Sequence, residues 1–190
     1  MRKIKSLAIG LVCVCLLGVV GACNVDKEKK VDPNIEVDFK TTEQSKMFFN
    51  NVRKLSYDIE EDKNTDRLFY RINERITDDD QLLLNLCIVQ DPKIDAVYLM
   101  LEPSKKIDVT KGIKLKWESN DGKSEGIYEY EQGNVHEQFS FLTEIYNGLI
   151  EQRSFYFVED GQEIPILDAE NEREAFRKTM MDYYRLVNIF

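Results

Sequence analysis

The sequence predicts an α+β protein: one antiparallel sheet of about six to eight strands, built from successive hairpins, with two helices from the second half of the chain covering one face. Between residues 35 and 130, apolar residues recur mainly with period two, the spacing of half-buried strands. In two later segments they recur at steps of three and four, the spacing of helices. Strands that come first and helices that come late favour this class over a parallel fold of alternating strands and helices.

The first segment of the predicted sheet is residues 35–39, where apolar and charged residues alternate as in a short, half-buried strand. The next segment, 41–54, is ambiguous. Thr42 is suited to cap a helix, whereas residues 48–52 equally suit a bulged strand. A strand is slightly favoured there.

Four further runs predict two hairpins. Residues 55–59 and 68–72 alternate cleanly on either side of a polar connection. Residues 82–89 and 94–101 are nearly continuous in apolar character, which predicts central strands that are covered on both faces. These two runs are the main core candidates.

A third hairpin is predicted from residues 113–117 and 127–130, because the connection between them contains the turn-forming pair Asp121-Gly122. Trp117 lies in the first of these runs and alternates with lysines. We expect this side chain to pack against the sheet.

The second half of the chain predicts a helix over residues 135–152, followed by a hairpin made of 155–158 and 163–167. Pro165 has no N–H group, so it is expected on a sheet edge or at a bulge. Asp168 is expected to cap a final helix. The residues predicted to share the buried face of that helix are Ala175, Phe176, Thr179, Met180, Tyr183 and Val187.

The N-terminus predicts an export signal. Three cations and no acids, Arg2, Lys3 and Lys5, precede an uncharged stretch over residues 7–22. At ~1.5 Å per residue this stretch is too short to span ~30 Å of hydrocarbon. Residues 1–22 are therefore predicted to be a removable signal peptide.

The end of this signal, Val20-Gly21-Ala22-Cys23, resembles the lipobox of bacterial lipoproteins, which signal peptidase II cleaves. The resemblance implies that Cys23 becomes the mature N-terminus and receives a diacylglycerol and usually an N-acyl chain such as palmitate. Several acyl chains make anchoring effectively permanent. The alternative is an ordinary secretory signal, which would leave Cys23 as a free thiol on a soluble periplasmic or secreted protein.

The sequence after the signal divides into a lipidated tether, residues 23–34, and a single globular domain, residues 35–190. Asn24 stands where lipoproteins retained in the inner membrane commonly carry aspartate. The resemblance therefore implies a cell-envelope protein at the outer membrane. The charged run after Cys23 could instead direct export to the cell surface.

The cysteines agree with this division, because Cys13 and Cys15 would leave with the signal and lipid would modify Cys23. Only Cys87 then remains, so the mature chain can form no intramolecular disulfide. Cys87 lies in the apolar run 82–89, where we expect a small buried hydrophobic residue.

Charge narrows the possible partners. Without the signal, 23 cations remain against 35 acids, a net charge of −12. Such a charge disfavours binding to nucleic acid and adhesion to an anionic lipid surface. The expected partners are the membrane, through the lipid on Cys23, and an envelope protein.

No catalytic, cofactor-binding or metal site is predicted. His136 is the only histidine, and its neighbours form neither a zinc-binding helix nor a catalytic triad segment. We expect it on the surface or at the start of a helix. The acidic runs 60–62 and 78–80 lack the spacing and glycine of an EF-hand loop, and they are expected to be solvated loops.

Three functions remain open. The first is a non-enzymatic interaction or assembly module, such as an accessory lipoprotein of a secretion apparatus. The second is a lipoprotein inhibitor or immunity factor that binds a cationic enzyme. The third is an envelope hydrolase with dispersed carboxylates.

Overall fold

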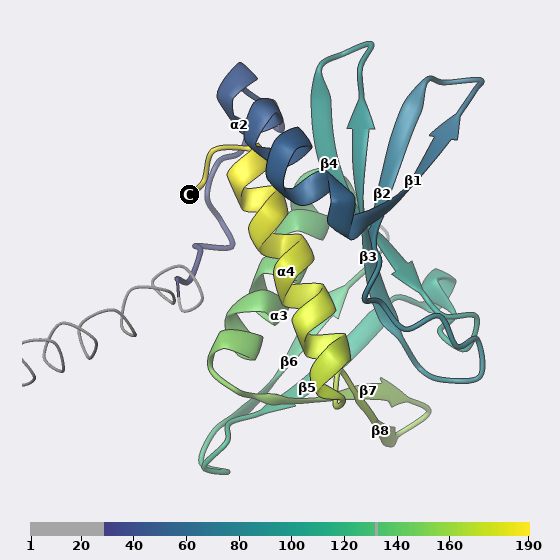
Figure 1. Cartoon of the computed structure of the whole chain (residues 1–190). Coiled ribbons are helices and arrows are strands. Elements are labelled where there is room, and N and C mark those ends of the chain that lie inside the picture. Colours follow the sequence, from purple (N-terminus) through teal and green to yellow (C-terminus); the bar gives the residue numbers. More distant parts are fainter. Residues whose placement is uncertain (1–28, 132) are drawn as a thin grey trace, which may run out of the picture. The chain divides into compact units, whose positions relative to one another are not determined.

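The computed structural model describes residues 29–131 and 133–190, and its compact unit is Val31–Phe190 (Figure 1). The α+β class is confirmed, but the strands form two antiparallel sheets of four rather than a single sheet. The predicted signal peptide and Cys23 lie outside the described residues.

The first sheet has the order β1-β2-β3-β4 and confirms two predicted hairpins. Its strands are β1 (Tyr57–Asp62), β2 (Arg67–Ile72), β3 (Leu84–Asp91) and β4 (Ala96–Pro103). Within β3, Leu84, Leu86 and Ile88 are buried, as expected of a central strand. The expectation that β4 is also central is wrong, because β4 forms an edge of this sheet.

The second sheet has the order β6-β5-β7-β8. Its strands are β5 (Ile113–Glu118), β6 (Glu125–Tyr130), β7 (Ser154–Glu159) and β8 (Gln162–Ile166). Asp160 and Gly161 join β7 to β8 with φ angles of 50° and 77°, the left-handed pair that a tight hairpin turn requires. Pro165 lies on the edge strand β8, as predicted.

The segment before β1 contradicts two predictions. Residues 35–39 form no strand, because Phe39 has a left-handed φ of 57° and only Lys40 makes an isolated bridge, to Ala96. The favoured strand over 41–54 is also wrong. This segment is the α-helix α2 (Glu43–Phe48), followed by the π-helix η1 (Phe49–Arg53) and the 3₁₀ turn η2 (Lys54–Ser56).

Thr42 caps α2, the alternative that the sequence left open. The Thr42 hydroxyl accepts a hydrogen bond from the Ser45 N–H at 3.1 Å, and the Ser45 hydroxyl accepts one from the Thr42 N–H at 3.0 Å. This reciprocal capping box satisfies two of the donors that a helix start leaves free.

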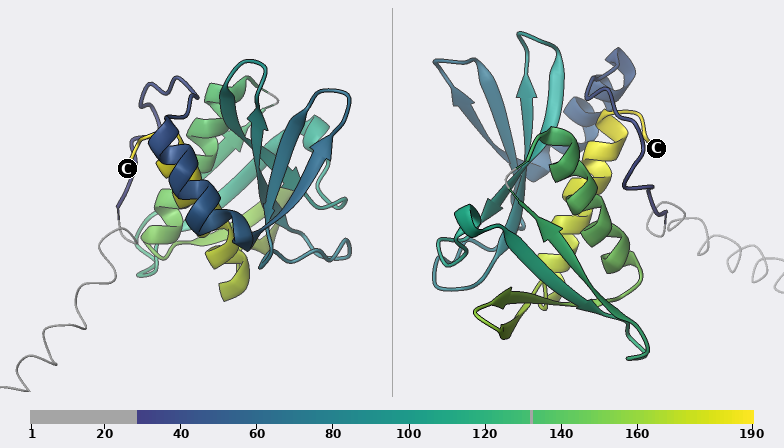
Figure 2. Two further views of the ribbon diagram at one scale, coloured as in Figure 1. Left: turned by 45° about the horizontal axis from the view of Figure 1, so that its top comes forward. Right: turned by 180° about the vertical axis from the view of Figure 1, so that it is seen from behind.

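Two long helices complete the fold and confirm the predicted late helices. They are α3 (Val135–Ile150) and α4 (Glu170–Leu186), which lie side by side (Figures 1 and 2). Helix α4 packs on β3 and β4, while α3 contacts β4 of the first sheet and β6 of the second. All six residues predicted for the inner face of the final helix are buried.

The compact unit includes Val31, which lies within the predicted tether, residues 23–34. Val31 is 5% exposed. Its N–H donates to Asn147 Oδ1 at 3.0 Å, and its carbonyl accepts from Asn147 Nδ2 at 2.7 Å. The chain is therefore fixed against α3 from Val31 onward.

Candidate functional site

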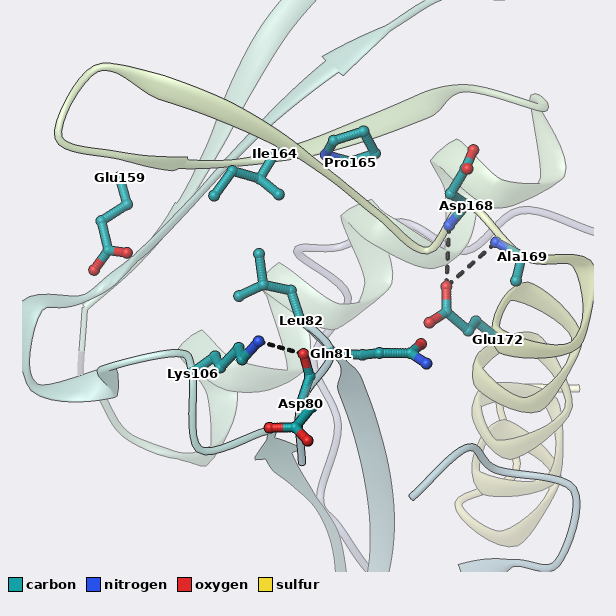
Figure 3. Close-up of a pocket in the computed structure, with 10 residues that line it drawn as sticks. All are labelled: Asp80, Gln81, Leu82, Lys106, Glu159, Ile164, Pro165, Asp168, Ala169 and Glu172. Atoms are coloured by element: carbon teal, nitrogen blue, oxygen red, sulfur yellow. Dashed lines mark hydrogen bonds between the residues drawn. The ribbon is translucent and has the colours of Figure 1, made fainter. Parts of the chain in front are cut away.

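A surface cleft of about 710 Å³ lies where the ends of the two sheets meet the start of α4 (Figure 3). Four separate segments contribute to its wall: the chain before β3, the β4–β5 connection, the β7–β8 hairpin and the first turn of α4. The lining residues are Asp80, Gln81, Leu82, Lys106, Glu159, Ile164, Pro165, Asp168, Ala169 and Glu172.

The cleft has an apolar middle and acidic ends. Leu82 and Ile164 point toward one another across it, with Glu159 on one side and Asp168 and Glu172 on the other (Figure 3). A short apolar floor between carboxylates suits a ligand that has an aliphatic stem and a positive end, such as a lysine or arginine side chain.

The charges of the lining are strongly unequal. Four lining residues are acids and one, Lys106, is a cation. The Lys106 ammonium donates to the backbone carbonyl of Asp80 and not to a lining carboxylate. Carboxylates gathered on a concave wall focus a negative potential and raise the local concentration of cations.

The wall beside α4 is held in place before any ligand binds. Leu167 is 2% exposed and has a left-handed φ of 52°, which turns the chain from β8 toward the helix. The Arg173 guanidinium donates to the carbonyl of Leu167 at 3.0 Å and to that of Arg153 at 3.1 Å. These bonds fix the turn that carries Asp168.

The prediction that Asp168 caps α4 is wrong. Ala169 is the N-cap, and the Glu172 carboxylate accepts hydrogen bonds from the N–H groups of Asp168 at 3.1 Å and Ala169 at 3.3 Å. Glu172 reaches back because it stands at the third position of the helix. The Asp168 carboxylate is therefore free to line the cleft.

His136 lies away from this cleft, in the first turn of α3, and is exposed as expected. Its ring meets Phe39 edge to face, with the ring centroids 4.6 Å apart. It borders a different hollow, of about 490 Å³, which residues 35–38 and 187–189 complete. The structure thus does not bring the only histidine to the acidic cleft.

Cys87 and Trp117 have the packing roles predicted for them. Cys87 is 0% exposed, and this burial raises the pKa of its thiol to about 12. Trp117 packs against the core and lies beneath the Arg153 guanidinium, whose carbon is 3.7 Å from the ring centroid.

The two acidic runs engage separate partners. Glu60 pairs with Arg71 at 2.8 Å, and hydrogen bonds from the Asn64 N–H and the Thr65 hydroxyl lower the pKa of Asp62. Asp79 pairs with Lys105, and Asp80 reaches the cleft. Over residues 29–131 and 133–190, no three histidine, cysteine, aspartate or glutamate side chains are grouped to hold a metal ion.

Comparison of the chain with protein-family models, curated proteins and solved structures finds no match. In the part of the chain that the structure describes, no helix combines the length and the apolar content that a membrane crossing needs.

No pattern in the sequence identifies this cleft. Leu82 and Glu172 come from opposite halves of the chain, and both line a cleft to which the chain before β3 and the β7–β8 hairpin, from different sheets, contribute. Period-two spacing shows that strands exist, but it does not show which hairpins share a sheet. The one local signal was the run 78–80, which contributes Asp80.

Proposed function

We propose that this chain is a lipid-anchored cell-envelope protein that acts as a non-enzymatic interaction module, with the cleft as its binding site for a basic segment of a protein partner. The anionic, preformed cleft is the observation that carries the binding proposal. The lipobox-like sequence at Cys23, together with Asn24, supports an anchor at the outer membrane.

The shape of the cleft favours a partner that inserts one side chain over a partner that presents a flat surface. It offers an apolar floor at Leu82 and Ile164, and carboxylates that an aliphatic cation can reach from that floor. A partner that inserts a lysine or arginine there would bury its stem and pair its charge. The excess of acids over the whole chain steers such a partner toward the domain.

The same cleft supports a second candidate, a lipoprotein inhibitor or immunity factor that binds a cationic enzyme. The two candidates differ in what occupies the cleft, not in the chemistry of contact. A multi-subunit assembly in fixed proportion would identify an accessory module. A single basic enzyme that loses activity in the complex would identify an inhibitor.

Affinity capture from gently solubilised envelopes tests the proposal. The cleft variant combines Glu159→Gln with Asp168→Asn, which removes two negative charges and leaves the capping Glu172 intact. We expect the wild-type chain to retain a protein partner that the cleft variant loses, and we expect raised salt to weaken the wild-type complex.

The matched control combines Glu61→Gln with Glu131→Gln, two exposed acids outside the cleft. It changes the net charge by the same amount as the cleft variant. Equal loss of the partner in both variants would show that overall charge, and not the cleft, binds it. If both variants retain the partner equally, the cleft is not the binding site.

A further inference from the structure

The cleft has two acidic ends, and one basic side chain can reach only one of them. Glu159 lies opposite Gln162 at the start of β8, whereas Asp168 follows Ile166 at the end of that strand. Gln162 and Ile166 are four residues apart, which is about 13 Å at ~3.3 Å per residue. A lysine side chain has five bonds from Cα to Nζ, and at ~1.5 Å per bond it cannot exceed about 7.5 Å. A ligand that uses both ends therefore carries two cations.

The Asp168 end offers an acid that the fold leaves unpaired. Among the described residues, none forms an ion pair or a hydrogen bond with the Asp168 carboxylate. Burial lowers the pKa of the nearby Arg173 guanidinium, which donates to two backbone carbonyls and not to Asp168. Glu172, the other acid at this end, already accepts two N–H groups at the start of α4. Asp168 is therefore the acid that a ligand cation can reach here.

The Glu159 end is partly neutralised by a lysine outside the cleft lining. Lys111 Nζ lies 3.7 Å from Glu159 Oε1, which is longer than the ~2.7–2.9 Å of a charge-assisted hydrogen bond. The Lys111 side chain is 64% exposed. Because an exposed pair of this kind contributes little, a ligand cation can compete with Lys111 for the carboxylate.

Between its two ends the cleft is apolar, and its charges nearly cancel. The Lys106 ammonium donates to the backbone carbonyl of Asp80, so the one cation of the lining lies beside the one acid of the middle. Leu82 and Ile164 form the floor between Glu159 and the start of α4 (Figure 3). The order along the cleft is therefore acid, apolar floor, acid.

The strand in this wall does not favour the addition of a further strand. β8 is an edge of its sheet, but Pro165 has no N–H group to donate to a neighbouring strand. Recognition at the cleft therefore depends on side chains. In an extended segment, residues i, i+2 and i+4 point to the same side, and residues i and i+4 are about 13 Å apart. This spacing matches the part of β8 that separates the two acidic ends.

We propose that the cleft binds an extended segment of the protein partner that carries a cation, an apolar residue and a second cation at alternate positions. The two cations pair with Glu159 and Asp168, and the apolar side chain lies on Leu82 and Ile164. The inference rests on the cleft as the binding site of the proposed function, and it names what the partner presents there. The cleft volume of about 710 Å³ is in the range of pockets that hold a drug-sized ligand.

The test measures the affinity of three short peptides for the full chain, purified in detergent, by isothermal titration calorimetry. All three are acetylated and amidated, so that their termini carry no charge. The proposed ligand is Lys-Ser-Leu-Ser-Lys. The isomer Ser-Lys-Leu-Lys-Ser has the same composition and charge, but its lysines are about 7 Å apart and point away from the leucine. The third peptide, Lys-Ser-Leu-Ser-Gln, keeps only one lysine.

We expect Lys-Ser-Leu-Ser-Lys to bind the wild-type chain about fivefold more tightly than either other peptide, the gain from one further exposed ion pair. Glu159→Gln and Asp168→Asn should each abolish this advantage, whereas Glu61→Gln, outside the cleft, should preserve it. Lys111→Gln should enlarge the advantage, because Glu159 loses its competing partner. Lys123→Gln, which removes an exposed cation from the β5–β6 connection, should not.

Each other outcome overturns a stated part of the inference. Equal affinity for all three peptides would exclude a ligand with two cations, and equal affinity for the two isomers would exclude the spacing. Displacement of the first peptide by spermidine at a concentration below the peptide's own Kd would assign the cleft to a free polyamine. If no peptide binds while affinity capture still depends on Glu159 and Asp168, the inference is wrong and the proposed function stands.

Discussion

Asp182 is a buried acid that joins three parts of the molecule. It is 2% exposed on α4, and both of its oxygens lie 2.8 Å from Arg53 Nε on η1. The Tyr57 hydroxyl of β1 donates to it at 2.7 Å. Burial, reinforced by the Asp182 charge, raises the pKa of Tyr57 well above its usual range, so the hydroxyl stays a donor. The buried charge is tolerated because its partners satisfy it.

Replacing Asp182 with alanine should therefore destabilise the fold by about 3 kcal/mol, since it leaves Arg53 and Tyr57 without their acceptor. The control is Asp58→Ala, which removes the partner of Arg75 from an exposed pair and should cost less than about 1 kcal/mol. Urea unfolding of the two variants measures the difference. Equal midpoints would mean that the Asp182 cluster contributes no more than a surface pair.

The burial of Cys87 predicts how the stability of the fold depends on pH and how slowly the thiol reacts. Burial raises the pKa of its thiol from 9.0 to about 12, so the folded chain favours the neutral thiol. The corresponding stability is fully present below pH 9.0 and is lost as the pH rises toward about 12. At pH 8, we expect the peptide that contains Cys87 to react with iodoacetamide slowly in the folded chain and rapidly in urea, as followed by mass spectrometry. Rapid alkylation of the folded chain would contradict the burial.

At the scale of elements, the hairpins and the two long helices were predictable because their apolar residues face the core. The segment 43–56 was not, because most of its large apolar residues are exposed. Its inner side carries Ser45, Phe49 and Arg53, whereas Val52 and Leu55 face outward. The left-handed Phe39 likewise interrupts an alternation that indicated a strand. In both places tertiary contacts override the local pattern.

Two substitutions at the start of α4 test the capping interaction directly. Glu172→Ala should cost about 1 kcal/mol, because it frees the N–H groups of Asp168 and Ala169. Asp168→Ala should change the free energy of unfolding by less than about 0.5 kcal/mol, since its side chain is exposed and does not cap the helix. A larger loss of unfolding free energy for Asp168→Ala than for Glu172→Ala would show that Asp168 caps the helix, as the sequence predicts.

At the scale of the whole molecule, the sequence indicated the α+β class, but it indicated neither the division into two sheets nor the cleft that this division forms. The connection between β4 and β5 ends one sheet and begins the next, and no residue spacing records that change. The proposed anchor, in contrast, is a local signal that ends at Cys23. The sequence therefore supports a location for the protein, and the structure supports a binding surface.

Metabolic labelling with a fatty acid tests lipid anchoring at Cys23, the central claim, most directly. The wild-type chain should incorporate the label and be processed, whereas Cys23→Ser should incorporate none and accumulate as the precursor, because the modified sulfur is absent. Label that persists in the Cys23→Ser chain, or a wild-type chain that incorporates none, would contradict the account.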